Sequence, residues 1–230
     1  MKTEKINYND YINIIGTAHF TRRSIKEAYE VVKTFQPIDL ALELDLKRFK
    51  RLNTACLACP RRGSCRGLCE FTVAAETLGN VNANIWLIDM TEEEMRDRIR
   101  RNTTHFERLH MPMYRSQLEN PTTLWERGFK LEAIKRSKGS IERLRRVRPN
   151  VWQVLIDERD TLMAARLRWI VLKRLREQKN NKVLALVGAA HADGIRKLLK
   201  NPYEIEEELK RLGLLFTKPI LIRRVAVGGD

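Results

Sequence analysis

The sequence contains no apolar run that approaches the roughly 20 residues needed to span a membrane as a helix. Its first ten residues, MKTEKINYND, lack the apolar segment of a secretory signal. None of the sequence motifs of the common nucleic-acid-binding domains is present either. These absences argue against a membrane-spanning, a secreted or a motif-based nucleic-acid-binding protein, and we expect a cytoplasmic location.

The composition is that of a folded globular protein with a strong positive charge. Of its 230 residues, 43% are hydrophobic and 32% are charged, which is enough for one substantial core. The formal net charge is +15 and the isoelectric point is about 10.0. Between Arg127 and Arg148, nine basic residues accompany two acidic ones. Such a run is typical of a solvated helix face, but its field also attracts an anionic ligand such as nucleic acid or a nucleotide.

Short apolar, β-rich runs alternate with amphipathic stretches along the chain, which predicts an α/β fold. Ser24 and Glu27 form a capping box that predicts a helix ending near Phe35, so the first two strands form a β–α–β unit and run parallel. Arg223 and Arg224 predict that the last strand lies at a sheet edge. We expect a central, mostly parallel sheet with flanking helices. The expected strands are 11–16, 38–44, 84–89, 182–187 and 219–227.

The pattern predicts one domain over residues 1–230, with two insertions in it. Residues 53–72 are rich in cysteine, and residues 95–150 are basic and helical with no strand pattern. His105 and His110 fall in the second insertion. They are five positions apart, so they lie on different faces of a helix and do not form one metal site.

A short phrase occurs twice, as Gly16-Thr17-Ala18-His19 and as Gly188-Ala189-Ala190-His191, each time directly after an expected strand. The chain has only four histidines. The ends of parallel strands meet at the edge where α/β sheets build their sites, and Glu43 ends the second expected strand. We therefore expect His19 and His191 at one edge with Glu43 between them. Two imidazoles and a carboxylate are a common ligand set for a divalent ion with an open position, as a hydrolytic metal needs.

Further charged residues accompany this set. Arg48 lies five positions after Glu43, and Glu158 and Arg159 open a helix expected over about 157–178. The arginines can stabilise developing negative charge, and a carboxylate that does not bind the ion can act as general base. The alternative is structural: a histidine after a strand can satisfy a turn, Glu43 can pair with Arg48, and acids favour a helix N-terminus.

All four cysteines, Cys56, Cys59, Cys65 and Cys69, fall within fourteen residues. In a chain without a secretory signal, this spacing favours metal ligation, by zinc or an iron–sulfur cluster, over disulfides or free thiols, which stay open as alternatives. The cluster would then be a structural staple for a loop that covers the substrate.

Four ordered motifs give the chain a family resemblance. GTAHFTRRS (Gly16–Ser24), ALELDLKRF (Ala41–Phe49), DERDTLMA (Asp157–Ala164) and ALVGAAHADGI (Ala185–Ile195) resemble those of the TraB/PrgY family, whose relatives include the Tiki proteins and the wider erythromycin-esterase/ChaN-like superfamily. The resemblance runs from about residue 11 to 200. It implies an α/β fold and, by analogy with Tiki, metal-dependent peptidase chemistry.

The resemblance also assigns residues. It places the two Gly-x-x-His motifs on His19 and His191 with their glycines, the family's glutamate on Glu43 and its arginine on Arg48. Its acidic-arginine motif falls on Asp157–Asp160. Many members carry membrane helices after this domain, but this chain has none, so a membrane role does not carry over.

Together these patterns predict a metal-dependent, peptidase-like hydrolase. The ion at His19, Glu43 and His191 would be Mn, Co or Zn, and the substrate a peptide or another small hydrolysable molecule. The alternative is a non-catalytic regulatory or binding module that holds a polyanion on the basic insertion. The sequence leaves the substrate and the oligomeric state open, a homo-oligomer included.

Overall fold

The structure is a computed structural model that describes residues 6–19, 21–57, 69–78, 83–109, 120–178 and 182–223. Its centre is one five-stranded sheet with the strand order β1-β4-β2-β3-β5. The first four strands in this order are parallel, and β5 is antiparallel to β3. The predicted α/β class is thereby confirmed. The strands are β1 (Ile12–Thr17), β2 (Asp39–Leu42), β3 (Asn84–Leu87), β4 (Val183–Gly188) and β5 (Ile220–Arg223).

The strand register brings the two Gly-x-x-His phrases together. Thr17 at the end of β1 lies opposite Gly188 at the end of β4, and the Glu43 N–H donates to the Leu186 carbonyl at 3.1 Å. The predicted lateral order is wrong in one respect. Strand β4 lies between β1 and β2, so the strand before His191, not the strand before Glu43, is the middle one.

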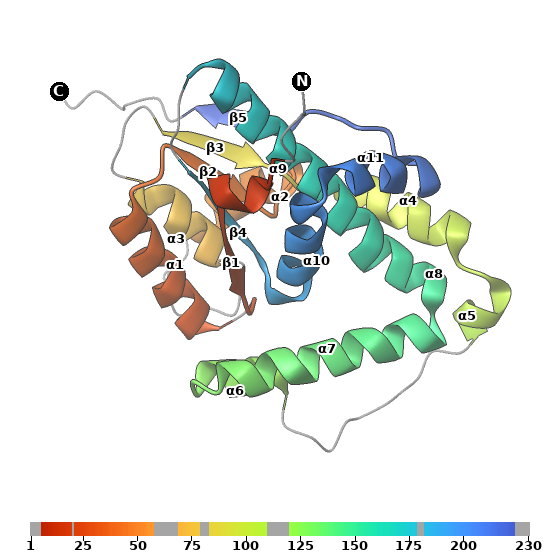
Figure 1. Cartoon of the computed structure of the whole chain (residues 1–230). Helices are drawn as coiled ribbons and strands as arrows, with labels where there is room; N and C mark the ends of the chain where they lie inside the picture. Colours follow the sequence, from red (N-terminus) through yellow and green to blue (C-terminus); the bar gives the residue numbers. More distant parts are fainter. Residues whose placement is uncertain are drawn as a thin grey trace.

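Helices cover both faces of the sheet (Figure 1). One face packs against α1 (Arg22–Phe35), α2 (Leu46–Leu57) and α3 (Cys69–Thr77), and the other against α9 (Arg159–Arg176) and α10 (Ala189–Lys200). Within β2, Leu40 and Leu42 face the first set while Ala41 faces the second. A strand buried on both sides must be apolar throughout, which explains the unbroken apolar runs in the sequence.

The remaining described elements lie around this core. Thr91 caps α4 and Pro202 opens α11. Strand β5 is an edge strand, as predicted for the last strand. The predicted long helix begins with a π-helical turn. These elements are the 3₁₀ turn η1 (Tyr8–Tyr11), α4 (Glu92–Asn102), α5 (His105–Leu109), α6 (Pro121–Glu126), α7 (Lys130–Val147), α8 (Pro149–Trp152), the π-helical turn η2 (Gln153–Glu158) and α11 (Pro202–Arg211).

The predicted cap of α1 is wrong. Thr21, not Ser24, caps the helix, because its hydroxyl oxygen accepts from the Ser24 N–H at 3.1 Å. Ser24 is buried inside the first turn, and its hydroxyl accepts from the Ala18 N–H at 3.0 Å. The helix therefore starts closer to β1 than expected, which ties the first Gly-x-x-His turn to the start of α1.

Replacing Thr21 with Ala should lower the free energy of unfolding by about 1 kcal/mol, because a buried helix end loses its cap. Lys26 lies on the exposed face of the same helix, so Lys26→Ala is the matched control and should change stability little. Urea unfolding measures both. A larger loss from Lys26→Ala than from Thr21→Ala would contradict the assignment of the cap.

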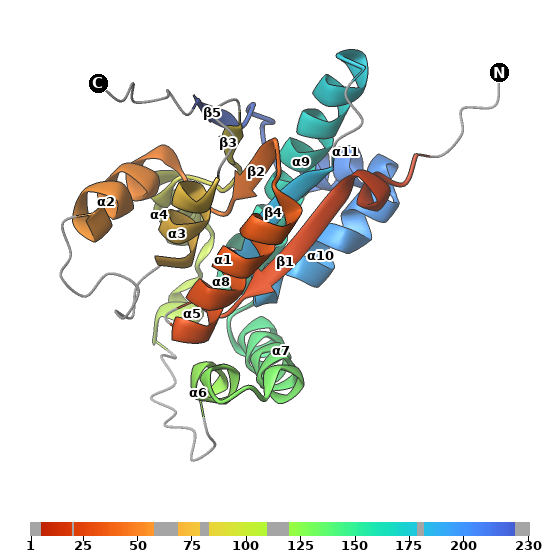
Figure 2. The same cartoon turned by 90° about the vertical axis from the view of Figure 1, so that its left-hand side faces the viewer.

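The basic insertion is helical over the residues described, as predicted, and no strand occurs among them. Helices α6 and α7 form a hairpin that lies across the carboxyl ends of β1 and β4 (Figures 1 and 2). Within the part of the chain that is described, no helix combines the length and apolar character that crossing a membrane requires.

Candidate functional site

A cavity of about 390 Å³ lies at the carboxyl ends of β1, β2 and β4. Its lining includes residues of both Gly-x-x-His turns and of the α6–α7 hairpin. Five of the six residues predicted to be catalytic line it, and Glu158 does not. These five are His19, Glu43, Arg48, Arg159 and His191.

His19 follows β1 and is held by a carboxylate. Its Nδ1 lies 2.6 Å from Oε1 of Glu70, a fully buried residue of α3. Its Nε2 reaches the end of β4, because a Cβ placed on Gly188 would lie 2.9 Å from it. Burial lowers the pKa of His19, but the hydrogen bond that its Nδ1–H donates to Glu70 and the charge of Glu43 outweigh burial and raise it.

His191 lies in the first turn of α10, which begins at Ala189, directly after β4. Its Nδ1 contacts Oδ1 of Asp160 at 2.6 Å, and its Nε2 lies 3.0 Å from Nη1 of Arg159. A guanidinium group only donates, so Nε2 accepts from Arg159 and Nδ1–H donates to Asp160. Burial raises the pKa of Asp160 to about 6, while His191 opposes the rise.

The two histidines thus share one arrangement. A buried carboxylate fixes each ring at Nδ1 and leaves Nε2 at the cavity, as the outer partners of metal-binding histidines do. The sequence prediction did not include these partners. Asp160 belongs to the acidic run at residues 157–160, and Glu70 directly follows the last cysteine, where the cysteine spacing is the stronger sequence signal.

Glu43 is buried, and both of its oxygens are occupied. Oε2 accepts from the Gly188 N–H and Oε1 accepts from Nη2 of Arg159, each at 2.5 Å. His191 Nε2 lies 3.6 Å from the same Oε1. Burial alone would raise the pKa of Glu43, but His191 and Arg159 lower it below its ordinary value. The carboxylate is therefore held ionised between the histidine and the arginine.

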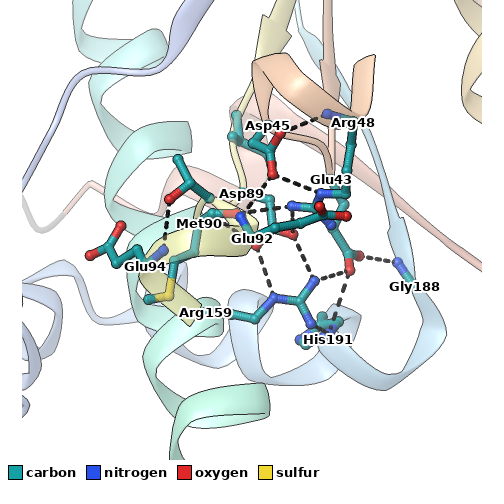
Figure 3. A network of polar contacts seen from close by, with 12 residues as sticks. Glu43, Asp45, Arg48, Asp89, Met90, Glu92, Glu94, Arg159, Gly188 and His191 are labelled. Carbon is teal, nitrogen blue, oxygen red and sulfur yellow. Dashed lines mark hydrogen bonds and ion pairs between the residues drawn. The ribbon is translucent and has the colours of Figure 1, made fainter. Parts of the chain in front are cut away.

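Asp89 lies between the two arginines and accepts hydrogen bonds from both (Figure 3). Arg159 donates to it through Nε at 2.9 Å and Nη2 at 2.7 Å, and Arg48 donates through Nη2 at 2.7 Å. Arg48 also donates through Nε to Asp45 at 2.9 Å. The alternative pairing of Glu43 with Arg48 is therefore wrong, because Arg159 is the partner of Glu43. Arg48 lines the cavity while two aspartates hold its guanidinium group.

The acidic residues at the start of the long helix do not all reach the cavity. Glu158 is buried against Arg98, at 2.5 Å, and against Gln153, at 3.1 Å. Asp157 pairs with Arg211 at 2.7 Å. The π-helical turn that ends at Glu158 sets the phase of the next turn, in which Arg159 and Asp160 reach the site.

The structure bears differently on the two predicted metal sites. Among the described residues, no group of three or more His, Cys, Asp or Glu side chains has an arrangement that could hold a metal ion. The predicted four-cysteine cluster lies outside what the structure describes. Cys59 and Cys65 are not among the described residues, and of Cys56 and Cys69 only the backbone is described. His110 is outside them as well, while His105 is exposed at the start of α5.

The residues at the cavity nevertheless fit a divalent ion. The missing side chain of Gly188 leaves a space bordered by His19 Nε2, by Glu43 Oε2 at 3.4 Å and by His191 Cδ2 at 3.6 Å from where its Cβ would be. One imidazole nitrogen and one carboxylate oxygen thus border a space that a methyl group would fill, and His191 presents a ring carbon to it. In the present arrangement Arg159 is the cation that Glu43 and His191 share.

The basic insertion forms the roof of the cavity. Lys130 of α7 pairs with Glu27 of α1 at 3.2 Å, and Lys138 of α7 pairs with Asp193 of α10 at 2.6 Å. Part of the positive charge of the insertion is therefore used to hold the hairpin against the two helices that follow β1 and β4. Binding of a polyanion by this insertion stays a prediction.

The comparisons with known proteins agree with the motifs. The model of the TraB/PrgY/gumN family matches residues 76–206. The chain belongs to the TraB/PrgY/gumN family. The family match includes Arg159, Asp160 and His191, whereas His19 and Glu43 precede it.

One curated relative adds a longer match. The chain is 27% identical over 219 residues to the uncharacterized protein MJ1365 of Methanocaldococcus jannaschii, an alignment that covers 82% of this chain and 53% of that protein. The chain thus spans about half the length of the relative it matches, and the relative's name assigns no activity. No solved structure matches the chain significantly.

Proposed function

We propose that this TraB/PrgY/gumN protein is a metal-dependent hydrolase that cleaves peptides. One observation carries the proposal: two histidines, each fixed at Nδ1 by a buried carboxylate, direct Nε2 toward Glu43 in a single cavity. This is the environment in which imidazoles serve as metal ligands. The family resemblance points to the same chemistry.

The charges around the cavity support a bound cation. Among the described residues, five carboxylates contact two guanidinium groups and two imidazoles, and only the guanidinium groups carry a fixed positive charge. Buried negative charge is costly unless a cation compensates it. A divalent ion supplies that compensation. The carboxylates are Glu43, Asp45, Glu70, Asp89 and Asp160.

His19 and His191 would hold the ion through Nε2, together with Glu43. When bound, the ion would lower the pKa of a water molecule and polarise a carbonyl group. Glu70 and Asp160 keep the two rings in one orientation and tautomer. Arg159 presents a fixed positive charge beside Glu43, where it can stabilise negative charge that develops on the substrate oxygen.

Binding of Mn²⁺ tests the metal site at His19, Glu43 and His191. Mn²⁺ favours oxygen and nitrogen donors over thiolates, so its binding is not expected to report on the cysteines. After treatment with EDTA, the protein is titrated with Mn²⁺, and the free ion is followed by electron paramagnetic resonance. We expect about 100-fold weaker binding in His19→Ala and in His191→Ala. His105→Ala, which removes an exposed histidine, is the matched control and should bind like the wild type. Equal binding in all four proteins would refute the site.

Hydrolysis is tested with a library of fluorescence-quenched peptides and added Mn²⁺, Co²⁺ or Zn²⁺. Cleavage that EDTA stops, and that is lost in both cavity variants but kept in His105→Ala, is the expected result. Metal binding without cleavage of any peptide would leave the site in place and remove peptides as its substrate.

A further inference from the structure

One edge of the sheet has no partner strand in the part of the chain that the structure describes. Strand β1 is the last strand on that side, and among the described strands it pairs with β4 alone. Figure 2 shows β1 along the front of the sheet, with α1 to one side of it and α10 to the other. The free edge of a strand offers backbone groups to which an extended peptide can add as a further strand.

The hydrogen bonds of the neighbouring strands show which groups of β1 face outward. The Leu186 carbonyl of β4 accepts from the residue after β2, so Leu186 points toward β2 and the preceding residue, Ala185, toward β1. In a parallel pair such a residue bonds the two residues that flank its register partner, which here is Ile14. Ile14 therefore turns its N–H and C=O outward, and so does Gly16. The Ile14 carbonyl agrees, since it accepts from Nη2 of Arg196 at 2.7 Å.

A basic groove of about 560 Å³ lies beside this edge. It is lined by β1, by the turn before it and by four residues of α10, of which three are exposed cations. The fourth, Asp193, already pairs with Lys138 at 2.6 Å and with Arg196 at 3.2 Å. Lys197 and Lys200 have no ion-pair partner among the described residues. The groove therefore carries uncompensated positive charge next to free backbone groups.

We propose that the free edge of β1 binds the substrate as an added strand, and that the substrate is an extended peptide with acidic side chains. Its backbone would bond the outward groups of Ile14 and Gly16. Its acidic side chains would lie over α10, against Lys197 and Lys200, and Arg196 would exchange the Ile14 carbonyl for one of these carboxylates. The inference rests on the proposed function, because it names the substrate class of that site.

The edge leads directly to the candidate site. Strand β1 ends at Thr17, and Thr17, Ala18 and His19 all line the cavity that contains Glu43 and His191. A strand advances by about 3.3 Å per residue, so a peptide paired along β1 places its next residues beside the cavity. One continuous surface thus joins the backbone edge to the reacting groups.

Charge favours this occupant over a second copy of the chain. Two β1 edges that pair about a twofold axis would bring the basic residues of both α10 helices to the same face of the joined sheet. Like charges across an interface oppose association, whereas an acidic peptide supplies the complementary charge.

The test uses fluorescein-labelled eight-residue peptides in which Thr alternates with Glu, Gln or Lys. Binding is measured by fluorescence anisotropy at low salt with EDTA present, so that nothing is cleaved. We expect the Glu peptide to bind about tenfold more tightly than the Gln peptide, and the Lys peptide to bind most weakly. Lys197→Glu combined with Lys200→Glu should remove the preference for Glu. Lys50→Glu combined with Lys210→Glu makes the same charge change at exposed positions of α2 and α11 and should keep it.

Selective N-methylation tests the added strand itself. In one form of the Glu peptide the amides of the Glu residues are methylated, and in another those of the Thr residues. Alternate residues of a strand bond to opposite sides, so only one of the two forms should lose affinity, by about tenfold. In the protein, the N–H groups of Ile14 and Gly16 should exchange more slowly with solvent when the unmethylated peptide is bound, whereas that of Ile15, which already faces β4, should not change.

Several results would overturn the inference. They are no binding of the Glu peptide, equal affinity for the three peptides, and equal affinity for the two methylated forms. A dimer in analytical ultracentrifugation, with the Ile14 N–H already protected in the absence of peptide, would assign the edge to a second copy of the chain instead.

The two proposals fail separately. Binding of the Glu peptide along β1 in a protein that binds no Mn²⁺ would keep the added strand and remove the metal-dependent hydrolase. Binding of Mn²⁺ that depends on His19 and His191, together with no preference among the peptides, would do the opposite.

Discussion

Replacing Asp89 with Asn should lower the free energy of unfolding by about 3–5 kcal/mol, the largest loss that we expect from a single substitution in this protein. Asp89 is buried and accepts from Arg48, Arg159 and the Met90 N–H. Burial raises its pKa, but the two guanidinium groups outweigh burial and hold that pKa well below its ordinary value. An amide would leave two buried guanidinium groups without their shared carboxylate.

Asp97→Asn is the matched control. It makes the same chemical change on α4, where the Asp97 side chain is 45% exposed and pairs with Arg100 at 3.0 Å. Exposed ion pairs contribute little, so we expect a loss of no more than about 1 kcal/mol. Urea unfolding at neutral pH measures both variants through the midpoint at constant slope. Similar losses in the two variants would show that Asp89 does not organise the arginines.

Gly188→Ala should strongly weaken metal binding while leaving the fold intact. The backbone at Gly188, with φ −59° and ψ 140°, is one that alanine adopts readily. The added methyl group would lie 2.9 Å from Nε2 of His19, so this ring, which is 27% exposed, must turn away from Glu43 and His191. We expect Mn²⁺ to bind about 100-fold more weakly and stability to change by only about 1 kcal/mol.

Gly139→Ala provides the control for a glycine without a close neighbour. Apart from its chain neighbours and the adjacent backbone of its own helix, no described atom lies within 4 Å of where its Cβ would be. The residue is in the middle of α7, where alanine favours the helix by about 1 kcal/mol. This variant should therefore bind Mn²⁺ as the wild type does. Undiminished Mn²⁺ binding in Gly188→Ala would mean that the ion does not occupy the space in front of this glycine.

The sequence predicted the local structure well because local structure depends on local patterns. Apolar runs marked four of the strands to within two residues at each end. The cap of α1 was misplaced because Thr21 and Ser24 are both hydroxyl residues near the helix start, and only the path of the chain after β1 decides which hydroxyl meets a free N–H.

The sequence predicted most of the residues that form the candidate site, but not which of them contact one another. His19, Glu43 and His191 follow strands, and the carboxyl ends of parallel strands always meet at one edge, so the sequence by itself brought these three together. Which arginine pairs with Glu43, and which carboxylates hold the two imidazoles, depends on the lateral order of the strands and on the phase of the helices behind them.

Tertiary structure alone therefore selected Arg159 over Arg48 and Asp160 over Glu158, and it brought Glu70 from α3 to His19. It also placed the basic hairpin over the cavity, which no periodicity in residues 95–150 could predict. The charge of the insertion follows from its sequence, but its position over the cavity depends on the surface against which it packs. Here that surface includes small residues between glycine and histidine in the two repeated phrases, Ala18 and Ala189.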